Sequence, residues 1–523
     1  MKENLLIHQT QATENRFWRK GLLFSLFPLL LVLLFLCVSA VPVAAQTEQP
    51  PAPSAPKTVS VPAVQEKKLP NGLRVAVIER KGNPLVTVQL LVKVGASFED
   101  ESRAGLANMT ADLLTKGTKT RSATQIAEEM AFLGSEINSG AGWNNSTVSF
   151  TATPDKVAAA LAVMSDVVRN PAFSQEELDL LRSQTLDELQ YNLKQPSFIA
   201  SYVASKYTYA EHPAGGTPVS LAAITRNDID NFHKSAYVPE ESVLIFSGDI
   251  TLPQAVSLTT AAFGKWGGPI TGRKELIQNI NESPASEPEN VKSVPTRRIL
   301  IIDLPKSGQA AVTVVKSIPV GRMDFGPNLK TEQINKQYFP AIVLNSVLGG
   351  GYSSRLNFEI RIKRGLSYGA GSNLAWRWGS SNFSGRAQTK SESAAEVATL
   401  VLDEIDKLMK GDVNNAELVP RKSVLTGNFD RNLETTAGLA NAVSDLYTFS
   451  IPINELNRYS PNVNAVTSSQ IRSFASQTLS NGDLIIVGDY AEFKDDLAKR
   501  FPGMTVDVIK VDDLDLSKDS LRK

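Results

Sequence analysis

The chain has 523 residues, of which 42% are hydrophobic and 21% are charged, a composition typical of an ordinary globular protein. Its length allows two or more domains, each large enough to bury a core. Basic and acidic residues balance at 54 each, and no basic run is interleaved with aromatic residues, so nothing indicates a nucleic-acid-binding protein.

The N-terminal segment predicts export. Arg16, Arg19 and Lys20 precede an apolar run that extends from residue 21 to about residue 45. A basic stretch, an apolar stretch and small residues at its end are typical of a secretory signal peptide. The run is also long enough to span a bilayer, so an uncleaved N-terminal anchor is the alternative.

The expected destination is a bacterial periplasm, either as a released protein or as a membrane-anchored protein that faces the periplasm. We expect residues 1–45 to form the signal peptide or anchor, and residues 46–62 to form a Pro-rich linker. The single cysteine, Cys37, lies in the apolar run, so a mature chain would carry no disulfide. Export without disulfides is the reason for preferring a bacterial envelope.

The rest of the chain contains an internal repeat. Thr225 matches Thr467 and Phe232 matches Phe474 at one separation (467 − 225 = 242 and 474 − 232 = 242). In both copies a capped amphipathic pattern leads through a turn into an apolar strand that ends in Gly-Asp. A repeat of this length indicates two copies of one domain rather than a solenoid.

The repeat sets the expected domain boundaries. We expect an N-terminal domain over residues 63–271, a linker over residues 272–296, a C-terminal domain over residues 297–511 and a tail over residues 512–523. Strands are grouped ahead of helices in each half, which predicts an α+β fold. The expected strands are 73–78, 86–94, 298–303 and 310–315, and the expected helices of the first half are 104–114, 123–133, 154–168 and 176–193.

One segment of the first half resembles a zinc-binding helix that lacks its ligands. Residues 104–118, AGLANMTADLLTKGT, resemble the helix of an inverted zinc-peptidase motif, H-x-x-E-H. In that motif two histidines on one helix face bind zinc, and the glutamate between them acts as general base. Here Asn108, Ala111 and Asp112 occupy those positions. Glu188, 80 positions after Asn108 (188 − 108), occupies the position of the third ligand on a second helix.

These substitutions predict that the chain binds no metal. Oxygen ligands such as Asp112 and Glu188 suit calcium, magnesium or manganese better than zinc, and no general base remains beside them. We interpret them as polar residues that fill a vacated pocket. The alternative is an independent hydrolase that uses an ion bound by these two carboxylates. His212 and His233 lack metal-ligand spacing and are expected to be packing or surface residues.

The second half carries a more complete motif. Gly349, Gly350 and Gly351 form a glycine loop, and Arg361 and Tyr368 follow it at a separation of seven (368 − 361). Glycines leave backbone N–H groups uncovered for a bound chain. Together with the degenerate zinc helix, the segments GGGYSSRL and RGLSYG resemble those of the pitrilysin, insulinase and mitochondrial-processing-peptidase family of inverted-motif zinc peptidases, in its non-zinc-binding subunit form.

The resemblance implies a fold and a set of roles. It implies two homologous domains of the mitochondrial-processing-peptidase type, each a mostly antiparallel sheet packed with helices. It implies that Arg361 and Tyr368 act in trans on the transition state and that the glycine loop binds substrate. The zinc is expected in a homologous partner subunit that carries the motif, so this chain itself would bind no cofactor.

Such a pair of chains would enclose a chamber of four homologous domains and act on peptides or unfolded protein segments. Peptides would add to an exposed strand edge, which the resemblance places at residues 142–153. The alternative function is a peptide-binding or scaffold protein of the cell envelope with no hydrolytic role. An oxyanion donor favours catalysis, because a binding protein does not need one.

Overall fold

The computed structural model describes residues 61–267, 296–324 and 333–523. The expected signal peptide or anchor, residues 1–45, lies outside them, as do nearly all of the two expected linkers, residues 46–62 and 272–296. Among the helices of the described ranges, none is both long enough and apolar enough to cross a bilayer.

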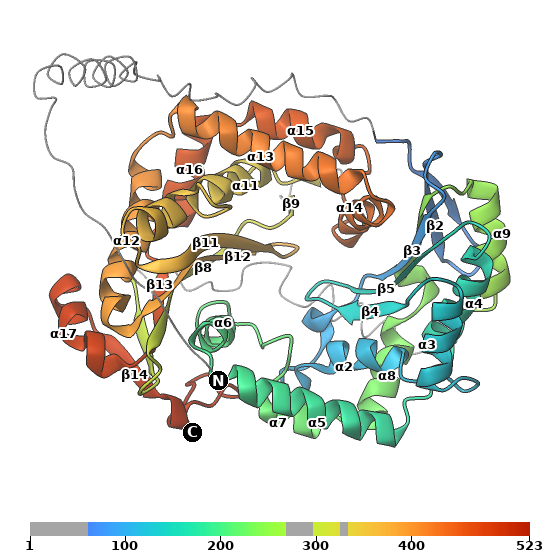
Figure 1. Ribbon diagram of the computed structural model, residues 1–523, viewed down its shortest axis with the longest axis horizontal. Coiled ribbons are helices and arrows are strands. Elements are labelled where there is room, and N and C mark those ends of the chain that lie inside the picture. Colours follow the sequence, from blue (N-terminus) through green and yellow to red (C-terminus); the bar gives the residue numbers. More distant parts are fainter. Residues whose placement is uncertain (1–60, 268–295, 325–332) are drawn as a thin grey trace, which may run out of the picture. The chain divides into compact units, whose positions relative to one another are not determined.

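The first half is built on a six-stranded sheet with the strand order β1-β2-β6-β3-β5-β4 (Figure 1). Strands β2 and β6 are parallel, and every other neighbouring pair is antiparallel. Helices α2, α4 and α9 pack on one face and bury the core of this half. The strands are β1 Gln65–Lys68, β2 Arg74–Glu79, β3 Val86–Val92, β4 Asn138–Ala141, β5 Ser146–Ala152 and β6 Ser242–Gly248; the helices are η1 Ala96–Phe98, η2 Glu101–Arg103, α2 Leu106–Leu114, α3 Ala123–Phe132, α4 Val157–Arg169, α5 Gln175–Asn192, α6 Pro196–Tyr207, α7 Pro218–Ala223, α8 Arg226–Ala236, η3 Pro239–Glu241 and α9 Leu252–Phe263.

The second half has its own six-stranded sheet, with the order β11-β12-β8-β13-β7-β14. Strand β7 is parallel to both of its neighbours, and the remaining pairs are antiparallel. The strands are β7 Ile299–Asp303, β8 Gln309–Ile318, β11 Ser367–Trp376, β12 Ser381–Lys390, β13 Asp483–Gly488 and β14 Val506–Lys510, with a separate pair β9 Met323–Asp324 and β10 Gln333–Ile334; the helices are α11 Tyr338–Leu348, the π-helix η4 Asn357–Ile362, η5 Ser391–Ser393, α12 Ala394–Lys410, α13 Asn415–Leu433, α14 Thr436–Thr448, α15 Glu455–Ala465, α16 Ser468–Thr478, α17 Tyr490–Arg500 and η6 Val511–Asp513.

The two sheets match in five of their six strands, and only the outermost strands differ, since β1 is antiparallel to β2 whereas β14 is parallel to β7. The order β2-β6-β3-β5-β4 in the first sheet corresponds to β7-β13-β8-β12-β11 in the second, with the same parallel and antiparallel pairings. The expected α+β fold of two homologous domains is therefore confirmed. The apolar patterns located these strands within a few residues, because each central strand is buried along most of its length.

The repeated helices begin in the same way. Thr225 and Thr467 are the N-cap residues of α8 and α16, and each forms a capping box with the residue three positions later. One turn further on, Ile229 and Ile471 are fully buried. The two helices lead into β6 and β13, the parallel partners of β2 and β7. The repeat in the sequence is therefore a repeat of local structure as well.

The edge strand expected in the first sheet is wrong by one strand. Residues 142–153 contain β5, which pairs with β3 on one side and with β4 on the other. The edge is β4, whose sequence NSGA has no large apolar residue to indicate a strand. Its counterpart in the second sheet, β11, is also an edge.

The two halves cover each other's sheets within one compact unit. Helix α14 of the second half packs on β3 and β6, and its Leu439 and Val443 share a hydrophobic cluster with Ile78, Leu91 and Ile245. In the reverse direction, α6 of the first half packs on β8 and β13. Each sheet therefore has one face against its own helices and part of the other face against a helix of the opposite half.

A buried ion pair also joins the halves. Arg377, directly after β11, donates two hydrogen bonds to the Glu211 carboxylate, at 2.8 and 2.7 Å. The two side chains are only 17% and 15% exposed. The Arg377 guanidinium carbon lies 4.8 Å from the centre of the Trp143 ring, which excludes water from one side of the pair.

We predict that Arg377→Ala lowers the free energy of unfolding by about 2–4 kcal/mol, because it leaves the Glu211 carboxylate buried without its cation. Chemical denaturation of the full chain measures this. Arg500→Ala is the matched control, since the Arg500–Asp496 pair is more exposed, at 34% and 40%, and should change stability by less than about 1 kcal/mol. Equal effects of the two substitutions would contradict the prediction.

Candidate functional site

Helix α2, which carries the degenerate zinc motif, is held at its N-terminus by the buried carboxyl group of Glu99. The N-cap residue Gly105 has a φ of 96°, which favours glycine, and offers no side chain to cap the helix. Glu99 supplies the missing acceptors, with hydrogen bonds from the N–H of Gly105 at 2.8 Å and of Ala107 at 2.7 Å. Carboxyl oxygens at this end of a helix satisfy N–H groups that have no partner within the helix.

Two positions of the degenerate motif are filled by packing and hydrogen bonding. Asn108 donates a hydrogen bond from Nδ2 to the carbonyl oxygen of Ala214 at 2.9 Å. Ala111, at the position of the general base, is fully buried and has no polar side-chain atom. The Asn108 side chain therefore ties α2 to the loop ahead of α7.

The other two positions are acidic and close enough to interact. Asp112 is exposed on α2, and Glu188 is exposed on the neighbouring α5. Desolvation by the surrounding protein raises the pKa of Asp112, while Lys116 opposes this rise and the negative charge of Glu188 adds to it. The structure thus places Asp112 close to Glu188, the two motif positions at which the sequence retains a carboxylate.

This set of side chains does not fit zinc. One position is an amide that already donates to a backbone carbonyl, one is a methyl group, and only two carboxylates remain. Within the described ranges, no group of three or more His, Cys, Asp and Glu side chains could hold a metal ion. No zinc-dependent step is therefore assigned to this chain.

Beside the helix lies a buried polar cluster that the sequence did not indicate. His212 Nδ1 lies 3.6 Å from Glu99 Oε1, and the His212 ring packs against Trp143 with their centres 5.0 Å apart. Burial raises the pKa of Glu99 to about 8, although the N–H groups of Ala107 and Gly105 act in the opposite direction. Burial also lowers the pKa of His212. Both side chains are therefore mainly uncharged near neutral pH.

The sequence offered little sign of this cluster. Glu99 lies between two short 3-10 helices, where there is no periodic pattern, and His212 is 113 positions away (212 − 99). His233, the other histidine of the described residues, packs in the core, where its Nε2 lies 2.8 Å from the Val168 carbonyl oxygen.

The glycine loop has one partly buried glycine and two exposed ones. A Cβ on Gly349 would lie 2.0 Å from the backbone nitrogen of Ser372 in β11, so only glycine allows this close approach. Gly350 and Gly351 are exposed. A Cβ on Gly350 would lie 2.7 Å from the Cα of Ser346, and Gly351 has a φ of 155°, which favours glycine. The local structure therefore explains all three glycines, and the two exposed ones are also accessible to a bound chain.

Arg361 and Tyr368 lie on an exposed surface directly after this loop. Arg361 is in the π-helix η4, a form common at functional sites, and its guanidinium carbon lies 5.3 Å from the centre of the Tyr352 ring. Tyr368, near the start of edge strand β11, is 91% exposed. Among the described residues, neither side chain forms a hydrogen bond or ion pair, and nothing joins them to Asp112 or Glu188.

Two family models of peptidase family M16 match this chain, one in each half. The model of the peptidase M16 inactive domain matches residues 223–425, and the model of insulinase, peptidase family M16, matches residues 74–217. An uncharacterized zinc protease of Mycobacterium tuberculosis is 26% identical over 72% of this chain and 81% of its own. The non-peptidase homolog YmxG of Helicobacter pylori is 22% identical over 79% of this chain and 91% of its own.

Solved structures share the fold. A peptidase M16 inactive domain from Pseudomonas fluorescens has a TM-score of 0.69 at 22% identity, covering 81% of this chain and 98% of that one. A protease from Helicobacter pylori has a TM-score of 0.71 at 18% identity, covering 82% of this chain and 100% of that one. The two-domain architecture is therefore one that these proteins have in common.

We predict that Gly349→Ala destabilises the chain by about 1–3 kcal/mol, because the added methyl group must displace the backbone of β11. The midpoint of thermal or urea unfolding measures the loss. Gly369→Ala in β11 is the matched control, since a Cβ on Gly369 would meet no atom within 4 Å. A Gly349→Ala variant as stable as this control would show that the loop is not packed against β11.

We predict that Glu99 makes the free energy of unfolding fall between about pH 5 and about pH 8. The native carboxyl, with its pKa of about 8, keeps a proton that the unfolded chain, with an ordinary value of 4.5, releases. The unfolded state therefore binds fewer protons, and raising the pH favours it by up to about 1.4 kcal/mol per pH unit. Urea unfolding across this range should give a flatter profile for Glu99→Gln. Parallel profiles would contradict the assignment.

Proposed function

Because the chain belongs to peptidase family M16, we propose that it is the non-zinc subunit of a heterodimeric zinc metallopeptidase that acts on peptides or unfolded protein segments. The observation that carries this proposal is the contrast between the two halves. The first half has no zinc ligand set on α2, whereas the second half presents Arg361 and Tyr368 on its surface with no hydrogen-bond partner among the described residues.

The retained residues act on the transition state. Tyr368 donates its O–H to the oxyanion of the tetrahedral intermediate, and Arg361 binds a substrate carbonyl or the same developing charge. Arg361 keeps its charge available, because its described contact is with the face of Tyr352 rather than with a carboxylate. Gly350 and Gly351, the exposed glycines, meet the substrate backbone.

The remaining chemistry belongs to a partner chain with a complete H-x-x-E-H motif, which holds the zinc and supplies the general base. Substrate adds as an extended strand to an open sheet edge. The edge strands of the two described six-stranded sheets are β1 and β4 in the first and β11 and β14 in the second, and β11 is the edge that carries Tyr368. The basic and apolar segments at residues 16–45 support export to a bacterial periplasm, as a released or an anchored protein.

A second candidate function is peptide binding or scaffolding in the cell envelope without hydrolysis. It is favoured by the description of the Helicobacter pylori relative as a non-peptidase homolog. The exposed Tyr368 hydroxyl separates the two candidates, because binding alone needs no oxyanion donor.

We predict that Tyr368→Phe lowers kcat by about 10²–10³-fold in a mixture of this chain with a zinc-motif homologue, since it removes one oxyanion donor. Peptide hydrolysis is measured for each chain alone and for the mixture, with and without a chelator. Activity should appear only in the mixture and disappear with the chelator.

The matched control is Tyr191→Phe, because Tyr191 is also an exposed tyrosine, at 65%, and lies on α5 of the first half rather than on β11. It should leave turnover unchanged. Turnover unaffected by Tyr368→Phe would exclude catalysis in trans, and absence of activity in every mixture would favour the binding or scaffold function.

A further inference from the structure

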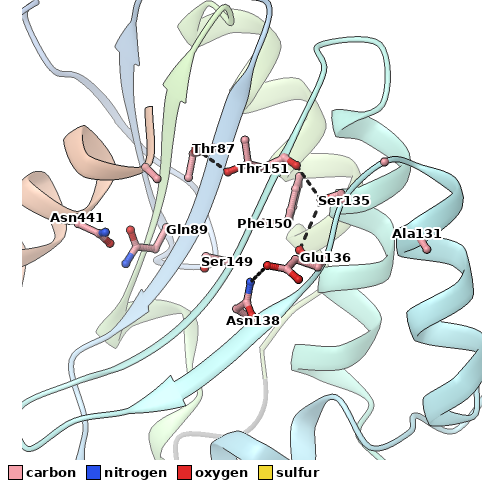
Figure 2. Close-up of a pocket in the computed structure, with 12 residues that line it drawn as sticks. Thr87, Gln89, Ala131, Ser135, Glu136, Asn138, Ser149, Phe150, Thr151 and Asn441 are labelled. Carbon is pink, nitrogen blue, oxygen red and sulfur yellow. Dashed lines mark hydrogen bonds between the residues drawn. The ribbon is translucent and has the colours of Figure 1, made fainter. Parts of the chain in front are cut away.

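A cavity of about 560 Å³ opens between the first sheet and α14 (Figure 2). Its wall is formed by β3, β5 and β4, by the turn that follows α3, and by one side of α14. None of its lining residues belongs to the degenerate zinc motif, to the glycine loop or to the Arg361–Tyr368 surface. It is large enough for part of a peptide or for a small molecule.

The floor of the cavity is a row of uncharged polar side chains. Gln89 on β3 lies directly opposite Ser149 on β5, and Ser149 lies directly opposite Asn138 on β4. Residues that pair across neighbouring strands share one face of the sheet, and the strands are about 4.8 Å apart. The row therefore leads from beneath α14 to the open edge of the sheet.

Gln89 is the informative member of this row. It is 6% exposed, and its carboxamide forms no hydrogen bond with any described residue. Its neighbour on the same face, Thr87, is fully satisfied, with the hydroxyls of Thr151 and Thr436 both at 2.8 Å. The Gln89 amide is not among the side-chain groups that are buried without a partner, so it faces the open space of the cavity. A ligand there could replace water as its hydrogen-bond partner.

A second carboxamide faces Gln89 across the cavity. Asn441 of α14 is exposed, and Figure 2 shows its amide directed toward that of Gln89, with no hydrogen bond between them. Each amide offers both donors and an acceptor, so a group placed between them can pair with both.

The charge of the wall narrows the ligand class. The lining contains no lysine, arginine or histidine, and its one carboxylate, Glu136, accepts a hydrogen bond from Asn138 at 3.2 Å. An anionic ligand would lose its hydration without gaining a cation. The aromatic residue of the lining, Phe150, is 2% exposed and packs into the core, so it offers little surface on which a sugar ring could stack.

We propose that this cavity binds an uncharged polar segment of a peptide, with a glutamine or asparagine side chain paired between Gln89 and Asn441. A carboxamide donates and accepts at the same time, which is the pairing that two facing amides require. The proposal rests on the proposed function only in taking peptides as the ligand class. It does not require zinc, a partner chain or hydrolysis.

The test is fluorescence anisotropy on the full chain, with short end-blocked peptides that differ at one central residue, glutamine, glutamate or leucine. The glutamine peptide should bind about tenfold more tightly than the other two. Leucine pairs with neither amide, and glutamate can only accept and loses its hydration without gaining a cation. Gln89→Leu and Asn441→Ala should each remove this preference. Asn464→Ala, an exposed asparagine on α15 outside the cavity, is the matched control and should keep it.

Equal binding of the three peptides would overturn the proposal, as would a preference that survives Asn441→Ala, a variant at an exposed position that leaves the core intact. Binding of a neutral oligosaccharide but of no peptide would assign the cavity to a different ligand class. The measurement uses this chain alone, so its failure leaves the Tyr368 turnover experiment unaffected, and loss of turnover in that experiment leaves peptide binding here intact.

Discussion

The packing of α14 across the first sheet is the interaction on which the rest of the structure depends. It buries the face of β6 that its own helices cannot reach: Leu244 and Phe246 belong to the core of the first half, whereas Val243 and Ile245 pack with α14. All seven residues of β6 are consequently buried. A strand covered on both faces is mostly apolar, which is why residues 243–246 form a continuous hydrophobic run rather than an alternating one.

The same helix determines where the sheet becomes polar. Leu439 and Val443 cover the central strands, while Ala437 and Asn441, four residues apart on another side of α14, line the cavity. Beyond the reach of the apolar side, β5 alternates between buried and partly exposed residues, as a strand with one solvated face does. The polar row from Gln89 to the sheet edge is therefore a direct consequence of how far α14 extends.

The sequence predicted those elements whose stability is local or strongly apolar. The capping threonines Thr225 and Thr467, with a buried isoleucine one turn later, were enough to identify the repeat, because capping and helical periodicity act over a few residues. The edge strand was misplaced because β4 contributes backbone hydrogen bonds but almost no apolar surface. The pairing of Glu99 with His212 was missed for another reason, since it arises only from tertiary folding.

The site was predictable to a similar extent. The sequence spacing predicted that Asp112 and Glu188 lie close together, and the structure places them on the helices α2 and α5, which pack against each other. The sequence did not distinguish Gly349 from the two glycines after it. The close approach that requires glycine at this position is made by Ser372 of β11, which lies 23 positions further on (372 − 349). The positions of a motif can thus be identified from the sequence alone. Why each position holds its particular residue becomes clear only from the residues that surround it in the fold.

The loss of the zinc ligands and the retention of α2 have a common physical explanation. The helix is anchored by Glu99 at its N-terminus and by the hydrogen bond from Asn108 to Ala214, and neither contact needs a metal. The fold therefore tolerates Ala111 at the position of the general base. Tyr368 presents the opposite case. Its side chain is almost entirely in solvent and contributes little to the stability of the fold, so the packing of the fold does not require a tyrosine at this position of β11.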